Sequence, residues 1–352
     1  MQSFLQLSAG VRAVAAVLAG LVVFLIFDQF HWWKRHDEYM FGMIVPFFVG
    51  FVVFDRWPRI YRILTGKRLG EKPDKNLAKF EERVEKTADS PADGVLVKLT
   101  TALAFCAVLG GLFFFLFGSL YRAMEGANLV TSTAYAYGFP AILLGTVFLL
   151  SRRTADDEPV PYRHRLMLTG MFLFPALIWM LSVPMFDVLN RAVSTTLMNQ
   201  VATIVYHTFD FLGYAIVREG SVLLLPSGEV GVEDACSGIR SLTACLFAGS
   251  FIGAVFFESF TKKVVMVGMA MVFAFINNIL RSLFLTAYAY GLGPGALEGD
   301  LEFLGMNLGN IHDFTGWVVL GLTVVVLLIL VKIFSIRLEF EMDPAQGAGA
   351  SA

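Results

Sequence analysis

The sequence predicts an all-α polytopic membrane protein with about eight transmembrane helices and a short β-hairpin on the outer face. Composition is the first reason, because 57% of the 352 residues are hydrophobic and only 16% are charged, with a mean hydropathy of +0.68. A soluble globular domain carries about a quarter of its residues as charges. The second reason is a series of apolar runs of about 20 residues, the length of helix that crosses a hydrocarbon core of about 30 Å.

The apolar runs follow one another along the whole chain. The first begins near Leu5. It is longer than the core of a signal peptide and is followed by no small-residue cleavage site, so we expect it to be retained as a span. The eight predicted spans cover residues 9–30, 39–55, 99–120, 131–151, 166–189, 239–258, 264–290 and 314–334.

These spans divide the chain into five parts, one of which is hydrophilic. That part, residues 55–98, is expected to be a solvated cytoplasmic insertion with an amphipathic helix near residues 74–86. The five parts are two helices in 1–54, the insertion 55–98, three helices in 99–190, a catalytic core with three helices in 191–334, and a cytoplasmic tail in 335–352.

The distribution of Lys and Arg predicts the orientation of the spans. Of the 27 Lys and Arg residues, 20 fall on one side of the predicted spans and five on the other, while Arg240 and Arg281 lie within or at the edge of spans. The side rich in positive charge faces the cytoplasm. We therefore expect a multi-pass protein of the inner cell membrane with both termini in the cytoplasm and with residues 190–238 and 291–313 outside.

The first of these outer segments is predicted to contain a helix and a hairpin. An apolar stripe over 194–217 indicates a helix in the outer interface. His207 and Asp210 lie on its polar side, where we expect them to be solvated rather than to bind a metal. The strands 222–225 and 229–232 flank a Pro-Ser-Gly turn and predict a hairpin that leads to Cys236.

Cys236 is the candidate nucleophile. It directly precedes the predicted span 239–258, and a helix N-terminus favours the thiolate, the reactive form of cysteine. Ser237 adjoins it, and Arg240 lies one helical turn further on the same face. The alternative for a cysteine in an apolar protein is a small packing residue.

The other two cysteines, Cys106 and Cys245, are expected in the core. Three cysteines form no disulfide framework. Cys236 and Cys245 lie about 13 Å apart along one predicted helix, which is too far for a disulfide bond. A chemical role is therefore considered for Cys236 alone.

Polar residues interrupt the seventh predicted span at Asn277, Asn278 and Arg281. Ionisable side chains within a span are costly unless they are paired or wet, so each indicates a functional site. Arg281 is expected about 25 Å along the helix from its cytoplasmic start, near the outer boundary. The asparagines lie one turn below and can orient the guanidinium or receive a substrate carbonyl. The alternative is that Arg281 only reaches the interface as an anchor.

His312 precedes the eighth span at the same predicted depth. A histidine near its ordinary pKa can take up and return protons at neutral pH. The neighbouring Asp313 can tune this histidine or cap the helix. A cysteine, an arginine and a histidine are thus predicted at the outer ends of three successive spans. This arrangement favours one shared catalytic site over three unrelated residues at the interface.

Together these residues resemble the exosortases and archaeosortases, a family of multi-span membrane cysteine transpeptidases. The resemblance rests on three motifs in order: Cys-Ser-Gly-(Ile/Leu)-Arg-Ser after a hairpin, Asn-x-x-Arg in the next span, and His-x-x-x-Gly at the start of the last. They stand at residues 236–241, 278–281 and 312–316. The first 160 residues contribute only a compatible pattern of spans, and the insertion 55–98 matches no catalytic feature of the family.

The resemblance implies an enzyme that cleaves the C-terminal sorting signals of exported proteins. Such substrates carry a short motif, a membrane helix and a basic tail, and the new carboxyl end can pass to an amine or lipid acceptor. Cys236 is then the nucleophile, Arg281 a required cation and His312 the third catalytic residue. Supporting or substrate-binding roles fall to Ser237, Arg240, Asn277, Asn278 and Asp313.

The same resemblance bears on partners and origin. We expect contacts with membrane lipids, and no metal, cofactor or nucleic acid. Histidine at position 312 resembles the bacterial members, whereas archaeal ones often have arginine there, so a bacterial origin is favoured.

Two other functions remain open from the sequence. A transporter or channel would use Arg281 and the asparagines to line a solute path near the bilayer midplane, but it gives Cys236 no role. A lipid-directed acyltransferase would use the same cysteine and the same acyl-enzyme, and would yield acylated lipid rather than a shortened protein.

Overall fold

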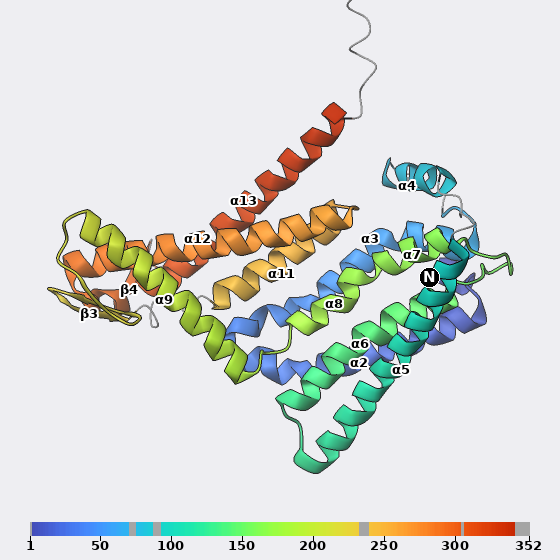
Figure 1. Ribbon diagram of the computed structural model, residues 1–352, viewed down its shortest axis with the longest axis horizontal. Coiled ribbons are helices and arrows are strands. Elements are labelled where there is room, and N and C mark those ends of the chain that lie inside the picture. Colours follow the sequence, from blue (N-terminus) through green and yellow to red (C-terminus); the bar gives the residue numbers. More distant parts are fainter. Residues whose placement is uncertain (1, 70–74, 87–92, 232–238, 304–305, 342–352) are drawn as a thin grey trace, which may run out of the picture. The chain divides into compact units, whose positions relative to one another are not determined.

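The computed structural model describes residues 2–69, 75–86, 93–231, 239–303 and 306–341 (Figure 1). The chain forms two compact units, Met1–Pro184 and Met185–Ala352, called unit 1 and unit 2 below. Within the described residues, seven helical segments are long and apolar enough to cross a membrane. The predicted class, a mostly helical polytopic membrane protein, is confirmed. The predicted span 239–258 forms a helix whose apolar part, Ser241–Phe256, is shorter than the other seven.

The elements that the structure describes in unit 1 are all helices. Local signals start its helices: the Ser8 hydroxyl accepts a hydrogen bond from the Val11 amide at 3.4 Å, and Asn128 and Thr131 form a capping box. Its elements are α1 (Gln2–Leu5), α2 (Ala9–Arg35), η1 (Asp37–Ile44), α3 (Val45–Thr65), α4 (Lys75–Lys86), α5 (Asp93–Glu125), α6 (Leu129–Leu150), α7 (Tyr162–Met171) and α8 (Leu173–Leu181).

The second and fifth predicted spans differ most from the structure. The second continues to Thr65 instead of ending at 55, because α3 stays amphipathic until Gly66, whose φ of +70° ends the helix. The fifth covers Tyr162–Leu181 instead of 166–189. It is interrupted at Phe172 between α7 and α8, and it stops before Pro184, since a helix rarely includes the residue that precedes a proline.

Glycines bring α5 and α6 into close contact. A Cβ placed on Gly111 would lie 2.6 Å from the Gly138 carbonyl oxygen, and one on Gly145 would lie 2.6 Å from the carbonyl oxygen of Ala104. Small residues let membrane helices approach backbone to backbone. Close backbone packing therefore holds these two antiparallel helices together, and no polar side chain is needed at these contact points.

The described part of the insertion contains one helix that packs on its neighbours. Its helix α4 lies where the amphipathic helix was predicted, and its Leu77 and Phe80 are buried in a cluster with Ile60 and Leu168 of α3 and α7. On the same helix, Glu81 pairs with arginines at the end of α3 and just beyond it. The predicted amphipathic helix is thus present, and its apolar side packs on α3 and α7.

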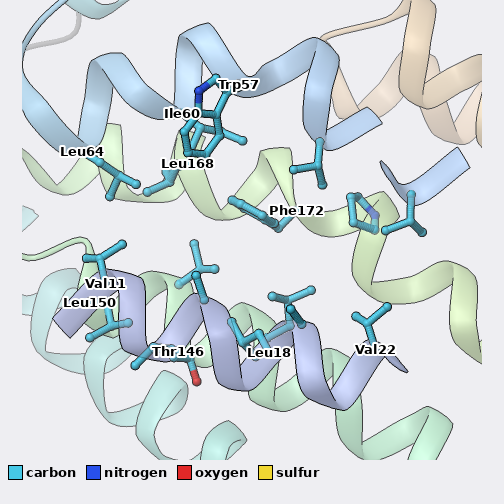
Figure 2. Close-up of a pocket in the computed structure, with 18 of the residues that line it drawn as sticks. Val11, Leu18, Val22, Trp57, Ile60, Leu64, Thr146, Leu150, Leu168 and Phe172 are labelled. Carbon is cyan, nitrogen blue, oxygen red and sulfur yellow. The ribbon is translucent and has the colours of Figure 1, made fainter. Parts of the chain in front are cut away.

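Unit 1 also contains an apolar cavity of about 450 Å³. Figure 2 shows Leu18 and Val22 of α2 on one side, with Trp57 and Ile60 of α3 and Phe172 on the other. Apart from Thr146 and the Trp57 ring nitrogen, the side chains that line it are hydrocarbon. The cavity therefore offers no nucleophile or general acid for a reaction.

The two cysteines expected in the core differ from each other. Cys245 is buried, as predicted, but Cys106 is exposed on α5. The large apolar neighbours Phe105 and Leu109 are exposed too. An apolar exposed surface on a spanning helix is what lipid contact requires, so the prediction for Cys106 is wrong because it mistook a lipid-facing position for a packed one.

The described part of unit 2 combines four long helices with two small sheets. In Figure 1, α11, α12 and α13 run alongside one another and α9 crosses α12. The elements are α9 (Asp187–Phe211), β1 (Val217–Glu219), β2 (Val222–Leu225), β3 (Gly228–Gly231), α11 (Ile239–Phe256), α12 (Phe260–Leu292), η2 (Pro294–Glu298), β4 (Asp300–Phe303), β5 (Met306–Asn310) and α13 (Ile311–Glu341).

The predicted hairpin is part of a larger sheet. Strands β2 and β3 pair antiparallel, with Leu223 opposite Val230, and β1 adds a third strand on the other side of β2. The helix predicted over 194–217 is α9, which begins at Asp187 and ends at Phe211. It stops early because Gly213 adopts a φ of +82°, a left-handed conformation that suits a helix C-terminus.

One apolar cluster joins these elements. It brings together Val201 and Val205 of α9, Leu223 of β2, Leu285 of α12 and Ile311 at the start of α13. Because all five side chains are buried, the cluster fixes the sheet and the first turn of α13 against the C-terminal part of α12. The candidate site lies directly beside this cluster along α12.

Candidate functional site

The site begins with the close packing of α11 on α12. A Cβ placed on Gly249 would lie 2.6 Å from Ala270 Cβ, and one on Gly253 would lie 3.4 Å from Lys263 Cα. The two helices are antiparallel, since they are joined by the short connection 257–259. Glycine at both positions allows this close approach.

The register of this contact gives the level of the α11 N-terminus. Ile239 lies 14 residues before Gly253 in α11, and Asn277 lies 14 residues after Lys263 in α12. Both helices rise about 1.5 Å per residue, so the N-terminus of α11 lies level with Asn277. Arg281 is four residues, or about 6 Å, further along α12.

Arg281 lies on the face of α12 that continues toward α11. The contacts at residues 263, 267 and 270 repeat with spacings of four and three, and the same pattern reaches Ala274, Asn277 and Arg281. Such alternation keeps one helix face against its neighbour. Ala274 and Asn277 are buried, and Arg281 is partly buried. The partly buried cation therefore faces the region where α11 begins.

A polar contact joins all three helices below Arg281. The Asn277 side-chain amide donates a hydrogen bond to the Thr323 hydroxyl at 2.6 Å, and Cys245 of α11 lies beside the same Thr323. All three side chains are buried. Asn277 thus acts within the packing of α11, α12 and α13, where its side-chain amide serves as a donor.

Arg281 itself contacts the first turns of α13. Its Nε donates a hydrogen bond to the Thr315 hydroxyl at 3.4 Å. A Cβ placed on Gly316 would lie 3.7 Å from Nη2 and 3.8 Å from Cζ of Arg281. The guanidinium therefore lies over bare backbone at Gly316, four residues after position 312.

Asn278 differs from its neighbour Asn277. Its side chain is only 4% exposed, and its Oδ1 accepts no hydrogen bond from the described part of the chain. A buried carbonyl without a donor costs about 1–3 kcal/mol. Within the Asn-x-x-Arg motif, Asn278 is thus the asparagine whose oxygen is free to accept a bond from another molecule or segment.

The structure describes the predicted site residues to different extents. Cys236 and Ser237 lie outside the described residues, between β3 and α11. For Arg240, His312 and Asp313 the backbone is described, in the first turns of α11 and α13, and the side chains lie outside the described part. The described residues therefore bring Arg281 to the start of α13 and to the level of the start of α11.

The sheet is fixed at the other end of the undescribed segment. The Ser227 hydroxyl donates to the Ala289 carbonyl oxygen at 3.0 Å, and a Cβ on Gly228 would lie 3.0 Å from Pro294. These contacts attach the β2–β3 turn and the first residue of β3 to the end of α12 and to η2, beyond Arg281. The segment that carries Cys236 thus starts and ends at points on either side of Arg281 along α12.

Sequence reasoning missed the partners of Arg281 and Asn277. Thr315 and Gly316 stand within the third motif but were given no role, and Thr323 lies unremarked in an apolar run. Threonine is common in membrane helices because its hydroxyl can bond its own backbone, as Thr323 does with Val319 at 2.9 Å. A polar residue on the same face of α13 as Thr315 was the available signal.

Comparison with known protein families now decides the relationship. The family model for transmembrane exosortases matches residues 32–329 of the chain. The chain belongs to the transmembrane exosortase family. The match extends over most of unit 1 as well as the three motifs of unit 2. No curated protein sequence and no solved structure gives a significant match.

Proposed function

We propose that this exosortase is a membrane cysteine transpeptidase or protease that cleaves C-terminal sorting signals of exported proteins through an acyl-enzyme. The observation that carries the proposal is the contact of Arg281 with Thr315 and Gly316, in the first turns of the helix that contains position 312. That contact lies near the level at which α11 begins, three residues after Cys236.

The proposed reaction follows from the residue types. The Cys236 thiolate attacks the scissile carbonyl carbon, and Arg281 stabilises the negative charge that develops on the carbonyl oxygen. The C–N bond then breaks, His312 gives its proton to the leaving amine, and a thioester remains on Cys236. An acceptor amine or water, deprotonated by His312, attacks the thioester and restores the free cysteine.

The transporter alternative is less well supported. Its solute path would need accessible polar groups midway along the helices. In unit 2, Asn277 and Thr323 at that depth are buried and hydrogen-bonded to each other, and Cys245 beside them is buried too. That arrangement serves helix packing, whereas Arg281 lies toward the helix ends.

The substrate has a layout that matches the enzyme. We expect exported proteins that end in a short shared motif, about 20 apolar residues and an Arg-rich tail. The basic tail stays in the cytoplasm, so the motif emerges at the outer interface. In the proposed orientation this is the face at which α11 and α13 begin, which places the scissile bond at the depth of Arg281.

The test is mass spectrometry of the C-terminus of one such protein in strains that express the wild type, Cys236→Ala or Cys106→Ala. We expect a C-terminus cut before the apolar stretch in the wild type and Cys106→Ala strains and an intact tail with Cys236→Ala. Cys106 is a suitable control because it is exposed on α5. Cleavage that persists in Cys236→Ala would refute the nucleophile.

The same spectra separate the remaining possibilities. An added mass on the new C-terminus identifies an amine or lipid acceptor and supports transpeptidation, whereas a free carboxylate supports hydrolysis. An intact tail in every strain, together with a lipid whose acylation depends on Cys236, would support the acyltransferase instead.

A further inference from the structure

We propose that Thr315 and Gly316 are positioning residues that hold the guanidinium of Arg281 beside position 312. The inference rests on the proposed function, in which Arg281 is the cation of the site. It adds a role for two residues of α13 that do not themselves touch the substrate. The two contacts are the hydrogen bond from Nε to the Thr315 hydroxyl, 3.4 Å, and the approach of Nη2 and Cζ to Gly316.

The need for such a device follows from the arginine side chain. Arginine has a long flexible stem that loses considerable rotamer freedom when it is fixed in one place. A cation that stabilises an oxyanion is effective only if it is already in place when the charge develops. Thr315 supplies an acceptor on a side chain whose β-branch restricts its own rotation, so the Nε end of the guanidinium has a fixed partner.

Gly316 contributes space rather than a hydrogen bond. At 3.7 Å from Nη2, an added Cβ would be in ordinary van der Waals contact, so alanine fits. A longer side chain would occupy the position of the guanidinium and displace it. The position thus requires a residue no larger than alanine, even though glycine destabilises a helix interior relative to alanine.

Thr315 and Gly316 together form the slot that holds the Arg281 guanidinium, and this slot lies beside position 312. Residues four apart in a helix lie on the same face, one turn from each other. Position 312 is four residues before Gly316, so it lies on the face of α13 that the guanidinium covers, one turn nearer the helix start. Thr315 and Gly316 therefore set the distance between the cation and the proposed proton donor.

The experiment compares Thr315→Val with Thr315→Ser, and Gly316→Leu with Gly316→Ala, in cleavage kinetics on a peptide that carries the sorting motif. Thr315→Val removes the acceptor at constant volume. We expect it to lower kcat roughly tenfold, which is about 1.4 kcal/mol of transition-state stabilisation, with KM unchanged. We expect Thr315→Ser to recover most of this loss, Gly316→Ala to lose little and Gly316→Leu to lose roughly a hundredfold. Gly321→Leu is the control on the same helix, because a Cβ there meets no neighbour.

A second measurement is independent of activity. Thermal unfolding of the single and double variants Arg281→Met and Thr315→Val gives their coupling, since residues in contact have non-additive effects. If the two substitutions change the unfolding temperature additively, the proposed contact between Arg281 and Thr315 is refuted, whether or not Cys236 is the nucleophile. If the unfolding temperatures show coupling but Thr315→Val and Thr315→Ser have equal kcat, the contact contributes only to packing. That result would overturn the positioning role. Cleavage that persists in Cys236→Ala would refute the proposed function instead, and with it the link between the slot and catalysis.

Discussion

Two adjacent asparagines in α12 have different environments, and the difference predicts different consequences of mutation. Asn277 donates to Thr323 within the packing of three helices. Replacing it with leucine leaves the buried hydroxyl of Thr323 without this donor and costs about 1–3 kcal/mol. We expect Asn277→Leu to lower the unfolding temperature measured in detergent, with cleavage per folded molecule largely preserved.

The neighbouring substitution, Asn278→Leu, should have the opposite profile. Because Oδ1 of Asn278 accepts no hydrogen bond from the described residues, its loss removes an unsatisfied group and leaves the unfolding temperature unchanged or raised. We expect a lower cleavage rate, since an unsatisfied buried group persists where function compensates for it. Equal thermal losses for the two variants would contradict the distinction.

At this scale, the sequence identified the residues but not their partners. The cost of charge in a span was enough to single out Arg281. Adjacent residues on a helix, however, face directions about 100° apart, and only the neighbouring helices decide which of Asn277 and Asn278 meets Thr323. The same limit applies to Thr315, whose importance depends on α12 lying against α13 at this register.

Among the elements, α5 and α6 provide a direct test of packing through small residues. Gly111 has no room for a Cβ, because the Gly138 carbonyl oxygen would be 2.6 Å away, whereas Gly110 meets nothing within 4 Å. We expect Gly111→Val to lower the unfolding temperature of the purified protein strongly. Gly110→Val in the same helix should have a small effect, and comparable losses for both would refute the close contact.

The helix α4 offers a second test at this scale. Phe80 is only 3% exposed and packs with Ile60 and Leu168, and phenylalanine to alanine changes in a core cost about 3–5 kcal/mol. We expect Phe80→Ala to release α4 and to raise the rate at which trypsin cleaves residues 67–86 in inverted membrane vesicles. Glu85→Ala, at an exposed position, should leave this rate unchanged. Equal rates would show that α4 does not dock.

The elements that the sequence predicted best were those with long apolar runs. The hairpin β2–β3 was also predictable, because Pro226-Ser227-Gly228 marks a turn between two short apolar strands. Strands β1, β4 and β5 were missed, since three to five residues give too little alternation to stand out. The end of α3 was misplaced because the helix continues as an amphipathic segment beyond the apolar run. The end of α8 was misplaced because the helix stops before Pro184, inside the predicted span.

For the whole molecule, the excess of positive charge predicts the orientation in the membrane. We expect Ser227→Cys and Asp300→Cys to react with an impermeant maleimide in intact cells, and Glu85→Cys to react only after permeabilisation. The background for each is a chain in which Cys106, Cys236 and Cys245 are alanine. Labelling in detergent controls for expression. Opposite labelling would remove the outer-face site on which the proposed reaction depends.

Depth along the helices was the one property of the assembled site that the sequence could supply. Counting residues placed Cys236, Arg281 and His312 near one level, because each helix rises by a constant amount. Counting residues does not give the rotation of a helix about its axis, and it does not identify the helices beside it. The close approach at Gly249 and Gly253, and the slot at Gly316, depend on which faces meet, and a single sequence does not report that.

The contact between Arg281 and α13 also gives the site an order in time. The ribosome makes α11 and α12 first, and the glycine contacts between them need nothing that comes later in the chain. Thr315 and Gly316 belong to α13, the last helix of the described chain. At about 5–20 residues per second, translation reaches them a few seconds after Arg281 is made. During that interval the nascent chain contains Cys236 and Arg281 but lacks Thr315 and Gly316, the residues that contact the guanidinium. In the proposed reaction, insertion of α13 is therefore the step that completes the site around Arg281 in a newly synthesised chain.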